Sequence, residues 1–351
     1  MTRNEFFEEL RREIKNVPAD ALEEILGDLN EHFDAGLADG LTENEICKNL
    51  GQPGSIAAEI MEEFRKSNME SHQDHDQQSI TIGGGSIISI EKVFDGINEV
   101  YIDMKVSDIY FERENRSDFR VTVKGKSRCD KYTIENKNGR LEVIEHEPIA
   151  NFFSLTFTKI KNLETTVYVP SQFTGSITAS SAAGKIKTKD LNSPIKLSSS
   201  AGSISVERHL SETADLDTAA GSITAEFLGK TAIHATTGAG SIKLKANETA
   251  ELKLDSGAGS IKAEIEKLTG SSKLSSGAGS VRLTAYDVAG DIKLSSGAGS
   301  IRAFLPEDAN IKLNLKKSSM GSVKSEINGN NSSPYTLKAQ TGMGSVRILR
   351  L

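Results

Sequence analysis

Apolar residues recur every three or four positions in two segments near the start of the chain. The first set is Phe6, Phe7, Leu10 and Ile14, and the second is Leu22, Ile25, Leu26, Leu29 and Phe33. This spacing places the side chains on one face of a helix. The pattern therefore predicts two amphipathic helices, of which the second ends at Gly40.

Two shorter helices are expected to complete a bundle. Thr42 and Glu45 have the spacing of a capping box, which predicts a helix in TENEICKNL. The turn residues GQPG then lead into SIAAEIMEEFRK. We expect a helical domain over residues 1–67, and the polar composition that follows predicts a linker over residues 68–79.

After the linker the period of the pattern changes to two. The segments VYIDMKVSDIYF, FRVTVKGKS, RLEVIE and TTVYVP alternate apolar and polar residues, which is typical of strands. Asn138 and Gly139 favour a tight turn between two of them. Residues 80–170 are therefore expected to form the strand-rich, N-terminal part of a β domain.

From residue 171 the alternation becomes a repeat, marked by one glycine in each unit. These glycines are Gly202, Gly221, Gly240, Gly259, Gly279, Gly299, Gly321 and Gly344. Their spacing is 19 or 20 residues at first and then rises to 22 and 23. A regular period of this length indicates a solenoid, a propeller or an array.

A typical unit, IKLSSGAGSIKA, holds two short strands and a glycine corner. Alternation turns Ile, Leu and Val inward, and Lys and Ser outward. Propeller blades need about 40 residues, and leucine-rich repeats need an Asn ladder with helical returns. The sequence therefore predicts an α+β multidomain protein: a small N-terminal α-helical bundle, then a C-terminal β-solenoid (β-helix) of about 19–20-residue coils, with its repeat over residues 171–351.

The recurring Gly-Ala-Gly has two structural explanations and one functional one. A sharp corner needs either a positive φ or close approach of the backbones of neighbouring coils. A phosphate-binding glycine loop opens a helix, whereas a strand follows here. The corners are therefore interpreted as structural.

The residues that could support catalysis or metal binding are not grouped in the sequence. The serine after each corner glycine recurs in every unit, whereas a catalytic nucleophile is unique and needs a nearby base. His72 and His75 form an H-x-x-H pair, but they fall in the predicted linker, where an accidental pair is the simpler interpretation. We predict no catalytic residue, no cofactor and no metal ion, and hence a non-enzymatic protein.

Charge is distributed unevenly along the chain, whose net charge is -7. Residues 1–70 hold 7 basic and 17 acidic residues, whereas residues 171–351 hold 22 and 16. The acidic helical domain is therefore expected to dock a basic protein partner.

Stacked coils would align basic residues into two columns. The first basic column comprises Lys243, Lys262, Arg282, Arg302, Lys324 and Arg347, and the second basic column comprises Lys253, Lys273 and Lys293. One interpretation is that these cations keep the strands hydrated and unaggregated. The other is a linear binding surface for an anionic membrane, an envelope polymer or nucleic acid. The scarcity of aromatic residues argues against nucleic acid.

The chain shows no apolar run of about 20 residues and no signal-peptide pattern, since its N-terminus is charged. Its two cysteines lack the spacing of a disulfide framework. We expect a cytoplasmic protein, peripheral at the membrane.

Two resemblances sharpen these expectations. ICKNLGQPGSIAAEI resembles the signature of HAAS-type helical domains, and the repeated GAGSIK is similar to bacterial adhesin-like β-solenoid domains, including those of LiaX-type envelope-stress proteins. The resemblance implies an interaction or regulatory protein of the bacterial envelope stress response, with the solenoid as binding surface and the head as docking module. A self-assembling scaffold, in which solenoids stack into filaments, and a surface adhesin are the alternatives.

Overall fold

The computed structural model describes the chain except at residues 16, 18, 39, 59, 62–77, 84–86, 126–131, 147–162 and 317–320. The chain divides into two compact units. Unit 1 is Met1–Asp76 with Pro148–Lys159, and unit 2 is Gln77–Glu147 with Ile160–Leu351. The segment 68–77 of the predicted linker and the pair His72 and His75 lie outside the described residues.

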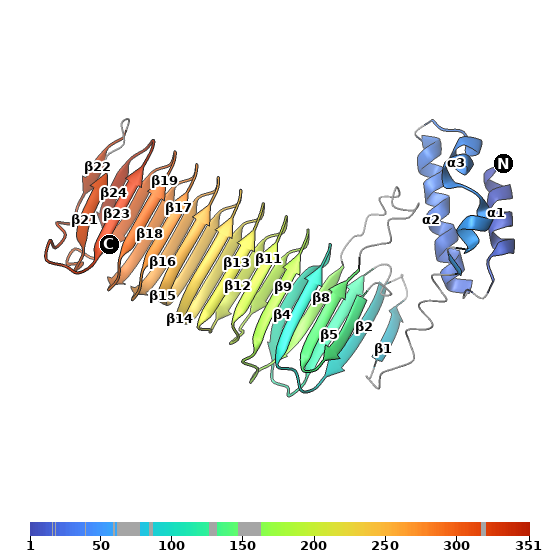
Figure 1. The fold of residues 1–351 in the computed structure, drawn as a ribbon, viewed down its shortest axis with the longest axis horizontal. Helices are drawn as coiled ribbons and strands as arrows, with labels where there is room; N and C mark the ends of the chain where they lie inside the picture. Colours follow the sequence, from blue (N-terminus) through green and yellow to red (C-terminus); the bar gives the residue numbers. More distant parts are fainter. Residues whose placement is uncertain are drawn as a thin grey trace. The chain divides into compact units, whose positions relative to one another are not determined.

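Unit 1 is helical, as its apolar pattern predicts (Figure 1). Its helices are α1 (Arg3–Glu13), α2 (Ala19–Ala38) and α3 (Glu43–Leu50), and residues 53–58 and 60–61 are also helical. Leu10 of α1 and Phe33 of α2 are fully buried in a shared apolar core. Thr42 and Glu45 form the predicted capping box. Thr2 and Glu5 form a second one at α1.

Unit 2 is built from strands. The strands before the repeat are β1 (Gln78–Gly83), β2 (Ile87–Phe94), β3 (Glu99–Met104), β4 (Asp108–Glu114), β5 (Phe119–Gly125), β6 (Tyr132–Lys137), β7 (Arg140–Glu145) and β8 (Glu164–Pro170). Those of the repeat are β9 (Ser176–Ser181), β10 (Ile186–Lys189), β11 (Ile195–Ser199), β12 (Ile204–His209), β13 (Thr213–Thr218), β14 (Ile223–Thr237), β15 (Ile242–Ser256), β16 (Ile261–Leu268), β17 (Ser272–Ser276), β18 (Val281–Val288), β19 (Ile292–Ser296), β20 (Ile301–Leu305), β21 (Lys312–Lys316), β22 (Val323–Ser325), β23 (Thr336–Thr341) and β24 (Val346–Arg350).

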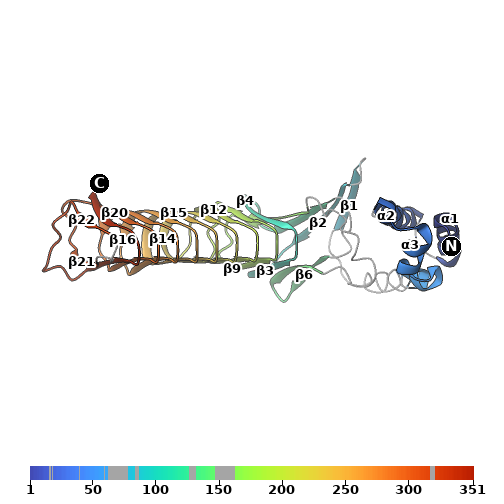
Figure 2. The same cartoon turned by 90° about the horizontal axis from the view of Figure 1, so that it is seen from above.

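Each coil of the repeat gives one strand to each of two parallel sheets, which face each other across the core (Figure 2). Wall A runs through β10, β12, β14, β15, β16, β18 and β20. Wall B runs through β9, β11, β13, β14, β15, β17 and β19. The long strands β14 and β15 belong to both walls, because their first halves pair in wall A and their second halves in wall B. The predicted solenoid is confirmed.

The N-terminal end of the solenoid differs from the repeat because antiparallel strands extend both walls. Wall A continues through β4, β8, β5, β2 and β1, of which the last three pairings are antiparallel. Wall B continues through β3, β7 and β6, and β6 and β7 form an antiparallel hairpin. Asn138 and Gly139 both have positive φ in its turn, as the sequence predicts. β1 begins at Gln78, so the last two residues of the predicted linker are in a strand.

The corner glycines are required by the close approach of neighbouring coils. A Cβ added at Gly240 or Gly259 would lie within 3.0 Å of the carbonyl oxygen of the corner glycine in the preceding coil. Neither of these two glycines has a positive φ. Of the two structural explanations, backbone contact therefore applies here.

The second serine of each SSGAG corner is buried, which corrects the expectation that the repeat serines point outward. The hydroxyl of Ser276 accepts a hydrogen bond from the Gly279 N–H (2.8 Å) and donates one to the Gly259 carbonyl of the preceding coil (2.9 Å). Equivalent residues form a buried hydroxyl column: Ser181, Ser199, Thr218, Thr237, Ser256, Ser276, Ser296 and Thr341. Strand alternation places these side chains inside, and the hydrogen bonds satisfy their polarity.

The coils at the C-terminal end do not stack in chain order. β23 and β24 pair with β19 and β20, and the earlier strands β21 and β22 then pair on the outside of β23 and β24. Residues 306–335 are thus an insertion in the repeat, whose described parts, 306–316 and 321–335, lie at the end of the solenoid (Figure 1). Ile311 and Ile327 of the insertion are buried against the core.

Candidate functional site

The first basic column forms on the outer face of wall A. Lys243 pairs with Lys262, Lys262 with Arg282, and Arg282 with Arg302 on adjacent parallel strands. Neighbouring strands lie about 4.8 Å apart, so the cations follow one another at that interval. Lys243, Lys262 and Arg302 are exposed, and Arg282 is half-buried.

The order of the last two cations differs from the chain order. Arg302 pairs with Arg347, and Arg347 pairs with Lys324. Lys324 therefore lies at the end of the column, and Arg347 lies inside it, because β24 stacks between β20 and β22. All six predicted members are nevertheless in register.

No described acidic side chain lies within ion-pair distance of these six cations. Arg282 instead contacts an aromatic ring, since its guanidinium carbon lies 5.0 Å from the ring centre of Phe304. Some cations elsewhere on the solenoid are paired: midway along the long strands β14 and β15, Lys230 Nζ lies 3.0 Å from Glu248 Oε1. The hydrogen bond from Lys230 lowers the pKa of Glu248.

The residues on either side confine the positive charge to a line. On one side, two positions before the cation and immediately before the strand, serine is found in every coil of the column, as at Ser260 and Ser280. On the other side, two positions later, the charges alternate through Glu226, Lys245 and Glu264. The first basic column is therefore a narrow, unpaired row of cations between an uncharged row and a mixed one.

The second basic column lies on wall B, the opposite face of the solenoid (Figure 2). Lys253, Lys273 and Lys293 are in register there and exposed. Lys273 Nζ is 3.7 Å from Asp255 Oδ1, so this column is partly neutralised.

Lys338 extends the second basic column, since it pairs with Lys293. Sequence reasoning missed it. The segment LKAQTGMGSVR has the alternation and the corner of the earlier units, and aligning it on IKLSSGAGSIR places Lys338 at the position of Lys293.

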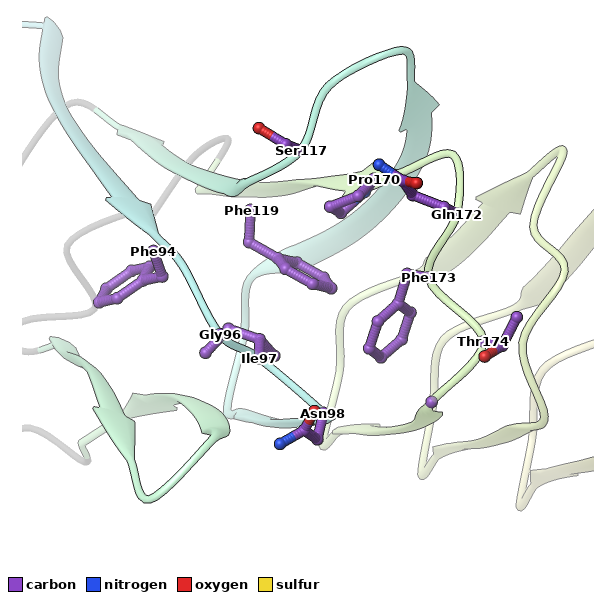
Figure 3. A pocket seen from close by; sticks show the side chains of 11 residues that line it. Phe94, Gly96, Ile97, Asn98, Ser117, Phe119, Pro170, Gln172, Phe173 and Thr174 are labelled. Atoms are coloured by element: carbon purple, nitrogen blue, oxygen red, sulfur yellow. The ribbon is translucent and has the colours of Figure 1, made fainter.

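A cavity of about 470 Å³ opens at the N-terminal part of unit 2 (Figure 3). Its floor holds Phe94, Phe119 and Phe173, and the rings of Phe119 and Phe173 meet edge-to-face at 4.8 Å. Its polar lining side chains are Asn98, Ser117, Gln172 and Thr174. None of its lining residues is ionisable, so this cavity provides no acid, base or charged nucleophile.

In the described part of the chain, no group of three or more His, Cys, Asp or Glu side chains is placed so that it could hold a metal ion. His209 is buried, and its Nε2 lies 2.9 Å from the Ser193 carbonyl oxygen. Desolvation lowers the pKa of His209 to about 4. None of the described helices is both long enough and apolar enough to cross a bilayer.

Family models match most of the chain. The model of the Toastrack DUF4097 family matches residues 97–349, and the HAAS model matches residues 5–59. No curated protein matches the sequence.

Solved structures resemble the chain only distantly. A candidate adhesin from Parabacteroides merdae ATCC 43184 is 14% identical, over 76% of this chain and 98% of that chain, with a TM-score of 0.47. A candidate adhesin from Parabacteroides distasonis ATCC 8503 is 16% identical over 77% and 98%, with a TM-score of 0.47. A candidate lipid binding protein from the same organism is 10% identical over 76% and 98%, with a TM-score of 0.37. Similarities this low say nothing about what this chain binds.

Proposed function

This chain belongs to the Toastrack DUF4097 family and carries an N-terminal HAAS domain, and we propose that it is a non-enzymatic binding protein of the bacterial cell envelope. In this proposal wall A is the binding surface, and its ligand is an anionic component of the envelope. The protein acts in the response to envelope stress, and the acidic helical unit docks a protein partner.

The observation that supports the binding role is the unpaired first basic column. Like charges at about 4.8 Å repel one another, and only water and mobile counterions offset that repulsion in the free protein. A bound anion removes the repulsion. The second basic column supports the role less well, because Asp255 already neutralises part of it.

Binding is tested with two anionic probes, phosphatidylglycerol vesicles in co-sedimentation and inorganic polyphosphate in calorimetry. The variant carries Lys262→Glu, Arg282→Glu and Arg302→Glu, and the matched control carries Lys253→Glu, Lys273→Glu and Lys293→Glu on wall B. Each cation near an anionic surface contributes about 1 kcal/mol, so the wall A variant should lose roughly 100-fold in affinity or more.

The wild-type protein should bind at least one probe in a salt-sensitive way, and the wall B control should retain most of that binding. Absence of binding to both probes, or equal losses in the two variants, would contradict the proposed function.

The docking role of the helical unit is tested separately with residues 1–70 as bait, since this unit has its own core. We expect capture of a basic partner that is released by salt. Capture of the same partner by residues 78–351 alone would contradict this role.

A further inference from the structure

A column of serine hydroxyls runs beside the first basic column on wall A. Each serine immediately precedes an inward-facing Ile or Val at the start of a strand, and the residue after that Ile or Val is a cation in every coil but that of Ser222, which has Thr224 there. The serine and the cation therefore both point outward. The serine column comprises Ser222, Ser241, Ser260, Ser280, Ser300, Ser345 and Ser322. Serine and cation of one strand are separated by about 6.6 Å along the backbone.

Three of these hydroxyls accept a backbone hydrogen bond from the next coil. Ser222 Oγ accepts a hydrogen bond from the Ser241 N–H (3.2 Å), and Ser241 Oγ accepts one from the Ser260 N–H (3.3 Å). Ser260 Oγ accepts one from the Ser280 N–H (3.2 Å). A hydroxyl that accepts such a bond through a lone pair still has its O–H to donate.

None of these three hydroxyls donates its O–H to another described residue. In four consecutive coils, from Ser241 with Lys243 to Ser300 with Arg302, wall A therefore presents one ammonium or guanidinium group and one O–H donor per coil. At the end of the solenoid the Ser322 hydroxyl instead donates to Ser345 Oγ (3.2 Å). Both kinds of group donate hydrogen bonds to an anion, and the cation attracts its charge.

This pair of donors suits phosphate better than carboxylate. A phosphate group carries strong acceptor oxygens that point in several directions, so one oxygen can accept from the cation while another accepts from the serine. A carboxylate has two oxygens in one plane, which favours a planar donor such as a single guanidinium. Charge alone would not distinguish the two anions.

The shape of the charge distribution favours a chain over a surface. The cations form a single row along the solenoid axis, and the row beside it is mixed in charge, with Glu226, Lys245 and Glu264. A membrane presents anions in two dimensions, whereas a linear polymer presents them in one.

We propose that the ligand of wall A is a linear phosphate-bearing polymer, held in the successive coils from Lys243 to Arg302 by one Lys or Arg and one Ser hydroxyl per coil. This inference rests on the proposed function and adds the chemistry of the ligand to it.

The test compares inorganic polyphosphate with poly-L-glutamate of similar charge, measured by calorimetry on the full chain at the same ionic strength. One variant carries Ser260→Ala, Ser280→Ala and Ser300→Ala. Its matched control carries Thr at the same three positions, which keeps the hydroxyls immediately before strands β16, β18 and β20. Extended backbone accommodates a β-branched residue there.

The wild-type protein and the Thr variant should bind polyphosphate about tenfold more tightly than poly-L-glutamate, and the Ala variant should lose this preference. Unchanged binding of poly-L-glutamate by the Ala variant shows that wall A is still folded. Equal affinity of the wild-type protein for the two polymers, or an equal loss for both in the Ala variant, would overturn the inference alone. Binding of neither polymer would overturn the inference, and the absence of vesicle binding as well would overturn the proposed function.

Discussion

Arg282 and Arg302 lie directly opposite each other on the adjacent parallel strands β18 and β20 of wall A. No described carboxylate is within ion-pair distance of either guanidinium. Opposed like charges destabilise a sheet unless solvent or a ligand intervenes. This pair represents the whole first basic column, in which the winding of the chain brings like charges together.

The corner glycines should be intolerant of a methyl group. Gly259→Ala would place a Cβ against the Gly240 carbonyl, which neighbouring strands on both walls hold in place. We expect the free energy of unfolding of the solenoid to fall by about 3 kcal/mol, measured by denaturant titration followed by circular dichroism. Gly27→Ala in α2 is the control, because its Cβ meets nothing within 4 Å. An unchanged free energy of unfolding for Gly259→Ala would mean that neighbouring coils are farther apart at the corner than the structure shows.

The buried hydroxyl column should contribute to stability through hydrogen bonds. Ser276→Ala leaves the Gly279 N–H and the Gly259 carbonyl without their side-chain partner, which should cost about 2 kcal/mol in thermal or denaturant unfolding. Ser275→Ala is the matched control, since Ser275 is the outward neighbour in the same strand.

Ser276→Thr should be tolerated, because Thr218 and Thr237 hold the same place in other coils. If Ser275→Ala and Ser276→Ala were equally destabilising, the inward hydroxyl would have no special role.

His209 should make the solenoid sensitive to acid. Its pKa is lowered to about 4 by burial, whereas an exposed histidine has a value near 6.5. Between these values the unfolded chain binds a proton that the folded chain does not, so stability must fall as pH falls from about 6.5 to about 4. The contribution lost is about 3 kcal/mol.

The measurement is the difference in unfolding free energy between the wild-type protein and His209→Leu at pH 7 and at pH 4. The variant removes the buried imidazole, so the wild-type protein should lose more stability than the variant on acidification. Parallel losses in the two proteins would show that His209 is not the group responsible.

The insertion 306–335 should keep the solenoid from stacking end to end. β22 has three residues, and β21 carries exposed Lys312 and Lys316, which are features of a protected sheet edge. Replacing residues 307–334 by a short Gly-Ser connection exposes the edges of β23 and β24. We expect sedimentation velocity to show concentration-dependent association of this variant and none of the wild-type protein. Filaments of the intact chain would instead favour the scaffold alternative.

Much of the fold follows from the sequence because it is periodic. Alternation placed Ile261 and Leu274 inside, and the glycine interval gave the length of a coil. The same alternation places Ser276 inside as well, but hydropathy suggests the opposite. The hydrogen bond from the Ser276 hydroxyl to the Gly259 carbonyl explains how this polar side chain can be buried. Gly259 belongs to another coil, so the sequence of one unit does not reveal this bond.

The end of the solenoid could not be predicted in the same way. The longer glycine intervals before Gly321 and Gly344 indicate an irregularity, but they do not show that β24 pairs with β20 ahead of β22. Pairing order depends on which backbone edges remain free once the chain has folded. For the candidate site, the sequence predicted that the cations align but not that Lys253 and Lys262 face opposite sides of the solenoid.

The most direct test of the binding face is lysine acetylation of the full chain, free and bound to polyphosphate, with mass spectrometry to read each site. The account predicts that the polymer protects Lys243, Lys262 and Lys324 of wall A. Lys253, Lys273 and Lys293 of wall B should be acetylated equally in both states. Equal protection on the two walls, or protection confined to Lys15 and Lys48 of the helical unit, would contradict it.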